Sequence, residues 1–343
     1  MALPTQPDGH DIVVVGASAG GVEALKTLVR ELPASLPAAV LIVLHVSPTG
    51  ASVLPGILGR AGRLAAAHAV DGERIVRGRI YVAPPDHHML VEDDRIRVTR
   101  GPRENGHRPA VDPLFRTAAE SHGAHVLGII LSGALDDGSA GLAVIRAHGG
   151  VAIVQDPGEA LSPGMPSSAI VHASPEHVLP VAKIGRLVAE LAGGAPARPR
   201  EPVAQAPRPK GWRAGAEPLP KGVVSDFTCP DCGGTLWESE QGNLVSFRCR
   251  VGHAFSVESL YDGKRDVLES ALWASVRAFE EQAGLARRLA TQMLASGDER
   301  LAETYELQAR EAEHRGTLVQ EVTARAYELT QQVAPPGMGV EPA

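Results

Sequence analysis

The chain has 343 residues, of which 44% are hydrophobic, and this length suffices for two or three modules with at least one substantial core. Its formal net charge is −7 and its aromatic content is 3%, which argues against a basic nucleic-acid-binding surface and against base-stacking platforms. No window approaches the roughly 18 consecutive apolar residues of a membrane helix, and the N-terminus lacks the pattern of a secretory signal, so we expect a cytoplasmic protein without membrane insertion.

Alternating strands and helices are expected over residues 10–192. Residues 12–17 and 39–46 are continuous apolar runs, typical of strands buried on both faces of a parallel sheet, and residues 21–32 between them have helical periodicity. Further strands are expected at 79–84, 96–100, 125–133 and 150–156, and further helices at 110–123, 138–150 and 181–194. This alternation predicts a doubly wound α/β domain with a mostly parallel sheet.

Three further segments are expected after this domain. Residues 193–222 contain seven prolines and no apolar periodicity, which indicates a linker that is extended where proline is dense. Residues 223–260 hold all three cysteines and form what we call the Cys/His module. Residues 261–333 are typical of two long amphipathic helices in a hairpin, with a break at 295–300 where Asp298 is expected to cap the second helix. Helices of this length could also mediate homo-oligomerisation.

A glycine-rich turn, G-A-S-A-G-G, follows the first expected strand from Gly16 to Gly21. It could be the phosphate-binding turn of a dinucleotide enzyme, although its spacing is not G-x-G-x-x-G and no acidic residue for a ribose ends the second strand. It also matches G-x-S-x-G, the nucleophile elbow, which would expose the Ser18 hydroxyl at the N-terminus of a helix. Both interpretations stay open on these residues alone.

A nucleophilic serine needs a base, and the base needs an orienting group. His45 is expected at the carboxyl end of the second strand, where sites of open parallel sheets form, although a lone histidine there could equally be structural. Asp136 and Asp137 follow a later strand, and either carboxylate could orient the imidazole or simply cap the next helix.

Six ordered segments over about residues 10–190 resemble the catalytic domain of the chemotaxis receptor protein-glutamate methylesterases, the CheB family. They are VVVGASAGGVEAL, LHVSP, GRIYVAPPDHHMLV, HRPAVDPLFRTAA, IILSGALDDGSAGL and QDP with PGMPSSAI. The resemblance implies a catalytic triad of Ser18, His45 and Asp137 that hydrolyses glutamyl methyl esters on helices of chemoreceptor-type proteins. It implies glutamine deamidation by the same acyl chemistry and no catalytic cofactor. Because the resembling region begins near residue 10, we expect no receiver domain before it.

Two loop residues depart from the family pattern. Ala134 and Leu135 replace a Met-Gly pair just before Asp137, and a glycine could be needed there for its backbone angles. A catalytically silent signalling scaffold is therefore the alternative to an active methylesterase, and a dinucleotide-binding oxidoreductase is the more distant one.

Several residues could belong either to the substrate surface or to the interior. His87, His88 and Met89 follow an expected strand and could face a receptor helix, or form a turn and a packing residue. His107, Arg108 and Asp112 are similar cases.

The Cys/His module contains Cys229-x₂-Cys232 and, after sixteen intervening residues, Cys249-x₃-His253. This pattern predicts a structural Zn²⁺ site with four protein ligands, which leaves no open position for catalysis by the metal. So short a segment also lacks enough core to fold unaided. A redox C-x-x-C pair is the alternative, and nothing in the surrounding charges indicates nucleic-acid binding.

Overall fold

The computed structural model describes residues 10–50, 52–193, 222–241 and 244–333. The chain divides into two compact units, and the division falls between Leu260 and Tyr261. Apart from its two end residues, the predicted linker 193–222 lies outside the described residues.

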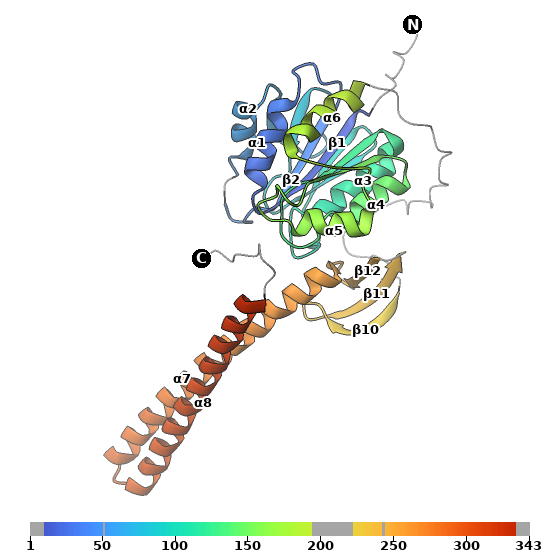
Figure 1. Cartoon of the computed structure of the whole chain (residues 1–343). Coiled ribbons are helices and arrows are strands. Elements are labelled where there is room, and N and C mark those ends of the chain that lie inside the picture. Colours follow the sequence, from blue (N-terminus) through green and yellow to red (C-terminus); the bar gives the residue numbers. More distant parts are fainter. Residues whose placement is uncertain (1–9, 51, 194–221, 242–243, 334–343) are drawn as a thin grey trace. The chain divides into compact units, whose positions relative to one another are not determined.

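A seven-stranded sheet forms the centre of the first unit (Figure 1), in the order β3-β4-β2-β1-β7-β8-β9 with every neighbouring pair parallel. Its strands are β1 (Ile12–Ala17), β2 (Ala39–Leu44), β3 (Ala65–His68), β4 (Arg79–Val82), β7 (Val126–Ile130), β8 (Val151–Gln155) and β9 (His177–Leu179). Every residue of β1, β2 and β7 is buried, because helices cover both faces of the sheet, as the continuous apolar runs predict.

Helices lie on both faces of this sheet (Figure 1). One face packs against α1 (Gly21–Glu31), α2 (Leu54–Ala61) and α6 (Val181–Gly193), and the other against α3 (Val111–His122), α4 (Ser139–Ala147) and α5 (Gly164–Ala173). A short 3₁₀ turn, η1 (Gly123–His125), joins α3 to β7. The doubly wound α/β prediction is confirmed.

Some sequence-based element predictions need correction. The strand predicted at 96–100 is not part of the parallel sheet: it is β6 (Arg95–Thr99), paired antiparallel with β5 (His88–Glu92). A two-residue turn that begins at Asp93, with φ of 53°, joins the two strands, and so short a connection permits only an antiparallel pair. Helices α2 and α5 and strands β3, β5 and β9 were not predicted, and the predicted β2 and β7 extended beyond their actual ends at Leu44 and Ile130.

The Cys/His module is a four-stranded antiparallel sheet in simple chain order. Its strands are β10 (Val223–Thr228), β11 (Thr235–Gln241), β12 (Leu244–Cys249) and β13 (Ala254–Ser256). Leu236, Phe247 and Phe255 make most of its small apolar core, and two of the cysteines are buried with them. The first residues of α7 (Val257–Ala295) follow β13 directly and end the first unit.

The second unit consists of the rest of α7 and of α8 (Glu299–Val333), which form the predicted helical hairpin (Figure 1). Asp298 Oδ1 accepts a hydrogen bond of 3.1 Å from the Leu301 backbone N–H, so the predicted N-cap of the second helix is confirmed. Buried alanines such as Ala283, Ala290 and Ala309 allow the helices to approach closely. Among the helices described, none combines the length and hydrophobicity that a membrane span requires.

Candidate active site and metal centre

Ser18 lies at the carboxyl edge of the parallel sheet, one residue after β1 ends. Its backbone N–H donates to the Ser132 carbonyl, 2.9 Å away, on the chain that leaves β7. Gly20 has φ of 74°, and a Cβ there would lie 2.7 Å from both Leu161 Cβ and Ser132 Oγ. The glycine therefore permits both the backbone angle and the close approach that bring Ser18 to the start of α1.

His45 occupies the matching position on the neighbouring strand. β2 ends at Leu44, which is in register with Ala17, and the His45 backbone N–H donates to the Ala17 carbonyl at 3.1 Å. The turn that holds Ser18 and the residue that follows β2 are thus joined directly through the backbone. The sequence prediction that these two residues leave adjacent strand ends is confirmed.

The side chain of His45 is buried and reaches Asp137, with 2.8 Å between His45 Nε2 and Asp137 Oδ2. An ionised carboxylate only accepts hydrogen bonds, so Nε2 of His45 is the donor in this pair, and in the neutral form of the ring Nδ1 carries the lone pair. His45 Nδ1 is also buried, and it has no hydrogen-bond partner among the described residues. The imidazole therefore offers an unengaged basic nitrogen at the carboxyl edge of the sheet.

Four hydrogen-bond donors surround the Asp137 carboxylate. Besides His45, Oδ2 accepts from the Val111 backbone N–H at 2.6 Å, and Oδ1 accepts from Asn105 Nδ2 at 3.0 Å and the Asp112 backbone N–H at 3.3 Å. The two backbone donors are the free N–H groups of the first turn of α3, where the helix dipole favours an anion. Burial opposes the charge of Asp137, but the hydrogen bond and charge of His45 and the Val111 N–H outweigh burial and lower its pKa far below the usual value.

Asp136, the other carboxylate that the sequence left open, lies elsewhere. Its Oδ1 accepts a hydrogen bond of 2.8 Å from Ser256 Oγ. Burial raises the pKa of Asp136 to about 7; the hydrogen bond from Ser256 counteracts this effect, whereas Glu258 adds to it. The structure thus brings Asp137, and not Asp136, to His45.

A second buried carboxylate, Asp112, lies next to Asp137. Its Oδ1 accepts from the Gly141 backbone N–H at 2.6 Å, and its Oδ2 accepts from Asn105 Nδ2 at 3.0 Å. Burial, and then the charge of Asp137, raises the pKa of Asp112 to about 8. At neutral pH Asp112 is therefore mostly protonated, and the negative charge of the pair resides on Asp137.

The ring of His107 stacks on that of His45, with 3.7 Å between ring centroids and 16° between planes. Burial, and then the charge of His45, lowers the pKa of His107 to about 4, so the stacked ring is neutral at pH 7. This neutral ring restrains the plane of His45 without adding charge. The sequence did not decide whether His107 lies on the substrate surface or in the interior. No sequence pattern around His107 indicated a contact with His45.

The loop after β7 closes over Ser18. A Cβ on Gly133 would lie 2.9 Å from Ser18 Cβ, so the loop backbone runs directly against the serine. Leu135 has φ of 58°, a left-handed conformation that suits glycine. A Cβ on Gly164 would lie 2.8 Å from the Leu135 nitrogen, so α5 packs closely against this loop. The expectation that position 135 needs unusual backbone angles is confirmed, and leucine adopts them here.

Several residues that the sequence left open between the substrate surface and the interior are part of the interior. Met89 is fully buried in the core under α3, and His88 is buried with its Nε2 2.8 Å from the Pro102 carbonyl. Arg108 pairs with Asp86 through Nε at 2.8 Å. A substrate-facing role for His88 and Met89 is therefore wrong, because their side chains point into the fold.

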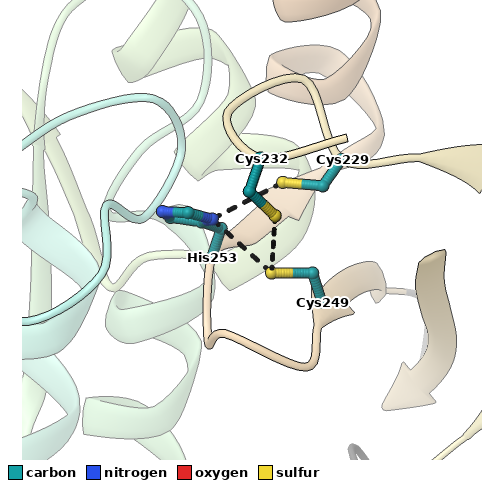
Figure 2. A group of neighbouring side chains, drawn as sticks. All are labelled: Cys229, Cys232, Cys249 and His253. Carbon is teal, nitrogen blue, oxygen red and sulfur yellow. Dashed lines mark hydrogen bonds between the residues drawn. The ribbon is translucent and has the colours of Figure 1, made fainter. Parts of the chain in front are cut away.

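The four predicted metal ligands converge in the Cys/His module (Figure 2). The sulfur atoms of Cys229, Cys232 and Cys249 and Nδ1 of His253 all lie within 4.8 Å of one another. His253 Nδ1 is 3.6 Å from Cys229 Sγ and 3.5 Å from Cys249 Sγ, and the sulfurs of Cys232 and Cys249 are 3.8 Å apart. A tetrahedral Zn²⁺ with bonds of about 2.3 Å to sulfur and about 2.0 Å to nitrogen spaces its ligands by ~3.8 Å and ~3.5 Å. The donor set and its spacing fit such an ion.

Two glycine turns present these ligands. Gly233 has φ of 70° and follows the first cysteine pair, and Gly252 has φ of 106° between Cys249 and His253. The other ring nitrogen of His253, Nε2, lies 3.8 Å from Asp231 Oδ2, which is within ion-pair range but longer than a hydrogen bond.

Comparison with known proteins places the first half of the chain. Residues 13–188 match the family model described as CheB methylesterase. Proteins of Rhizobium johnstonii and Pseudomonas aeruginosa, both named protein-glutamate methylesterase/protein-glutamine glutaminase 2, are each 39% identical to this chain, over 181 and 185 residues. These matches cover 52% and 53% of this chain and 49% and 53% of the relatives, so the chain spans about half the length of each. A Leptospira interrogans protein, provisionally named for the same two activities, is 38% identical over 183 residues, which cover 53% of this chain and 95% of that protein.

A solved structure agrees with this assignment. The crystal structure of the Thermotoga maritima CheB methylesterase catalytic domain aligns with a TM-score of 0.51 and 32% identity, covering 53% of this chain and 98% of that one. The family match begins in β1, just before Ser18, and ends in α6, the last helix on the parallel sheet. The chain belongs to the CheB methylesterase family.

Proposed function

We propose that this protein is a serine hydrolase that removes methyl esters from glutamate side chains of chemoreceptor-type proteins, with deamidation of glutamine as a second activity. The names of its relatives support the substrate class. The observation that carries the proposal is the His45 imidazole, held at Nε2 by Asp137 and unengaged at Nδ1, at the strand end beside Ser18.

In the proposed reaction, His45 Nδ1 removes the proton of the Ser18 hydroxyl as Ser18 Oγ attacks the γ-carbonyl carbon of the ester. The protonated imidazole then gives this proton to the departing methoxide, and methanol leaves an acyl-enzyme. Water, deprotonated in turn by His45, releases glutamate and restores the serine. With glutamine as substrate, ammonia replaces methanol as the leaving group. The anionic Asp137 stabilises the imidazolium in both halves of the reaction.

The tetrahedral intermediate needs hydrogen-bond donors for its oxyanion. The loop from Gly133 to Leu135 runs against Ser18, and we assign the Ala134 backbone N–H to this role together with the N-terminus of α1. One such donor is typically worth about 10²–10³ in turnover. A backbone donor does not depend on the side chain, so replacement of the family's methionine by alanine is compatible with activity.

Active-site labelling tests the proposal. A fluorophosphonate should modify the wild-type chain on Ser18, identified by peptide mass spectrometry, and should not modify Ser18→Ala. Ser275→Ala, which alters an exposed serine on α7, is the matched control and should be labelled like the wild type. A wild-type chain that is not labelled would favour the silent scaffold, and binding of a nicotinamide cofactor would favour the oxidoreductase.

We further propose that the Cys/His module binds one structural Zn²⁺ through Cys229, Cys232, Cys249 and His253, with a redox C-x-x-C pair as the alternative. The convergence of three sulfurs and one imidazole nitrogen supports the zinc site. Elemental analysis of the purified chain should give about one zinc per chain, and Cys249→Ser should lose it. Ser246→Ala, on the same strand but outside the cluster, should keep it. Undiminished zinc in Cys249→Ser would remove that ligand from the site.

A cytoplasmic location belongs to this proposal, because a reducing compartment keeps cysteine ligands available for a metal. Homo-oligomerisation through α7 and α8 also stays a prediction. Large side chains such as Leu285 and Leu307 are exposed on the hairpin, which suits a helical partner. Light scattering of the full chain would give the mass that decides between a monomer and an oligomer.

A further inference from the structure

A tight turn precedes α3 in the chain and contacts the Cys/His module. We call it the Asn105 turn (Glu104–His107). Glu104 and His107 exchange backbone hydrogen bonds of 3.2 Å and 2.9 Å, and Asn105 and Gly106 have φ of 51° and 76°. Two positive φ angles at an Asn-Gly pair are typical of a type I′ turn. The end of this turn stacks His107 on His45, and its tip directs the Asn105 amide at Asp137.

The same turn is bonded to the Cys/His module within the first unit. The Asn105 backbone N–H donates to the Ala254 carbonyl at 2.7 Å, and the Ala254 N–H donates to the Arg103 carbonyl at 3.3 Å. Asn105 Oδ1 accepts from the Ser256 backbone N–H at 3.0 Å and from Ser259 Oγ at 2.9 Å. Ala254 directly follows His253, one of the four candidate metal ligands. Asn105 therefore connects the strand after the metal cluster to the carboxylate that orients His45.

These contacts fix which end of the Asn105 amide faces Asp137. A backbone N–H can only donate, so Ser256 requires the oxygen of the amide on its side. The amide nitrogen must then face the opposite way, toward the two carboxylates, where its two hydrogens serve Asp137 Oδ1 and Asp112 Oδ2 at 3.0 Å each. Asn105 is almost fully buried, so water has little access to these hydrogen bonds.

A second bond ties the same two parts together. Ser256 Oγ donates to Asp136 Oδ1 at 2.8 Å, one residue before Asp137. The residues after the metal cluster thus hold both the Asn105 turn and the loop that carries Asp137. If these residues moved away, Asn105 would lose the two donors that orient its amide, and Asp137 would lose a fixed donor.

We propose that Asn105 is a positioning residue that couples metal binding in the Cys/His module to the orientation of Asp137. This inference rests on the proposed function, because its effect is exerted through Asp137 and His45. The bound metal fixes the position of His253 and of β13, which follows it. The Ser256 backbone N–H of β13 orients the Asn105 amide. The amide donates to Asp137, which in turn orients the His45 imidazole. Metal loading of the module therefore supports turnover without the metal touching substrate.

The first test compares turnover of methylated chemoreceptor fragments by full-length variants. Asn105→Gly accepts the positive φ without strain and removes the side chain with its amide. We expect kcat to fall about 10- to 100-fold with KM unchanged, because a misplaced orienting carboxylate affects the chemical step and not substrate binding. Ser259→Ala, which removes one donor to Asn105 and no metal ligand, should give a smaller loss. Ser246→Ala, on the same module but outside these contacts, should behave as the wild type.

A double-mutant cycle separates coupling from general destabilisation. If Asn105 carries the coupling, Ser259→Ala adds no further loss in an Asn105→Gly background, and neither does Cys249→Ser. Independent structural damage would instead multiply the losses. Multiplied losses, or a wild-type kcat in Asn105→Gly, would overturn the inference.

A spectroscopic readout makes the test independent of turnover. The hydrogen-bonded Nε2 proton between His45 and Asp137 should give a downfield ¹H resonance in the zinc-loaded wild type. This resonance should shift or broaden in Asn105→Gly and after removal of zinc, and it should persist in Ser246→Ala. An unchanged resonance after both changes would contradict the coupling. Activity that survives Ser18→Ala would overturn the proposed function itself, which is a distinguishable outcome.

Discussion

Asp137 and Asp112 are neighbouring buried carboxylates that the fold treats in opposite ways. Asp137 receives four donors, including the imidazole of His45, and its pKa is lowered. Asp112 has fewer donors and faces the charge of Asp137, and its pKa rises to about 8. The pair therefore carries one negative charge, and this charge lies on Asp137, which contacts His45. The proposed reaction requires this arrangement.

The pH dependence of stability tests this division of charge. Because the folded-state pKa of Asp112, about 8, exceeds the unfolded value, the folded chain keeps a proton that the unfolded chain loses. Asp112 therefore makes the free energy of unfolding fall as pH rises from about 4 to about 8, by up to about 1.4 kcal/mol per pH unit. Denaturant titrations at several pH values between 5 and 8 give the free energy of unfolding at each pH. This free energy should fall less steeply with pH for Asp112→Asn than for the wild type. An equal pH dependence of the unfolding free energy in the two proteins would mean that Asp112 is ionised in the folded chain.

Leu135 gives a second prediction at this scale. Its left-handed backbone costs about 1–2 kcal/mol relative to a right-handed one, and a β-branched side chain tolerates it least. Leu135→Gly should change the free energy of unfolding by no more than about 1 kcal/mol, because relief of strain offsets the entropy that glycine gains in the unfolded state. Leu135→Val should be clearly less stable than either. Thermal unfolding of the three proteins checks the order, and a valine variant as stable as the wild type would contradict it.

At the scale of elements, apolar runs predicted the sheet well where strands are long. β1, β2 and β7 are continuous apolar stretches. Because the carboxyl ends of parallel strands meet at one edge, these runs predicted that Ser18, His45 and one of Asp136 and Asp137 lie there, and the choice of Asp137 came from the resemblance to the CheB family. β3 and β9 were missed because four and three residues are too few for a periodic signal.

The roles of His107 and Asn105 were not predicted, because they depend on contacts between residues far apart in the sequence. The Asn-Gly pair at 105–106 is a recognisable turn signal, and it could have identified the Asn105 turn. No local pattern, however, indicates that His107 stacks on His45 or that Asn105 reaches Asp137, because more than 30 residues separate each pair in the chain. The convergence of Cys229, Cys232, Cys249 and His253 was predictable, because their spacing alone defines the two turns that carry them.

Metal removal gives the prediction at this scale. The core of the Cys/His module consists of a few side chains around Phe247, so we expect its fold to need a metal ion at the cluster. A chelator should abolish the amide dispersion of β10–β13 in NMR spectra while the resonances of the parallel sheet keep their dispersion. Readdition of Zn²⁺ should restore the module. A module that stays folded without metal would contradict a structural role for the ion.

At the scale of the whole molecule, a CheB methylesterase domain is followed in one chain by the Cys/His module and a helical hairpin. Hydrogen bonds between residues 103–107 and 254–259, next to Asp137, join the methylesterase domain to the Cys/His module. The division into segments 10–192, 193–222, 223–260 and 261–333 stays a prediction, and limited proteolysis of the full chain would locate its boundaries.

The most direct measurement is methanol release from a methylated chemoreceptor fragment by the full-length, zinc-loaded chain, run beside Ser18→Ala. The wild type should release methanol in proportion to the glutamate restored, and the serine variant, with an unchanged far-ultraviolet circular dichroism spectrum, should release none above the uncatalysed rate. Equal release by the two proteins would contradict the assignment of Ser18 as the nucleophile.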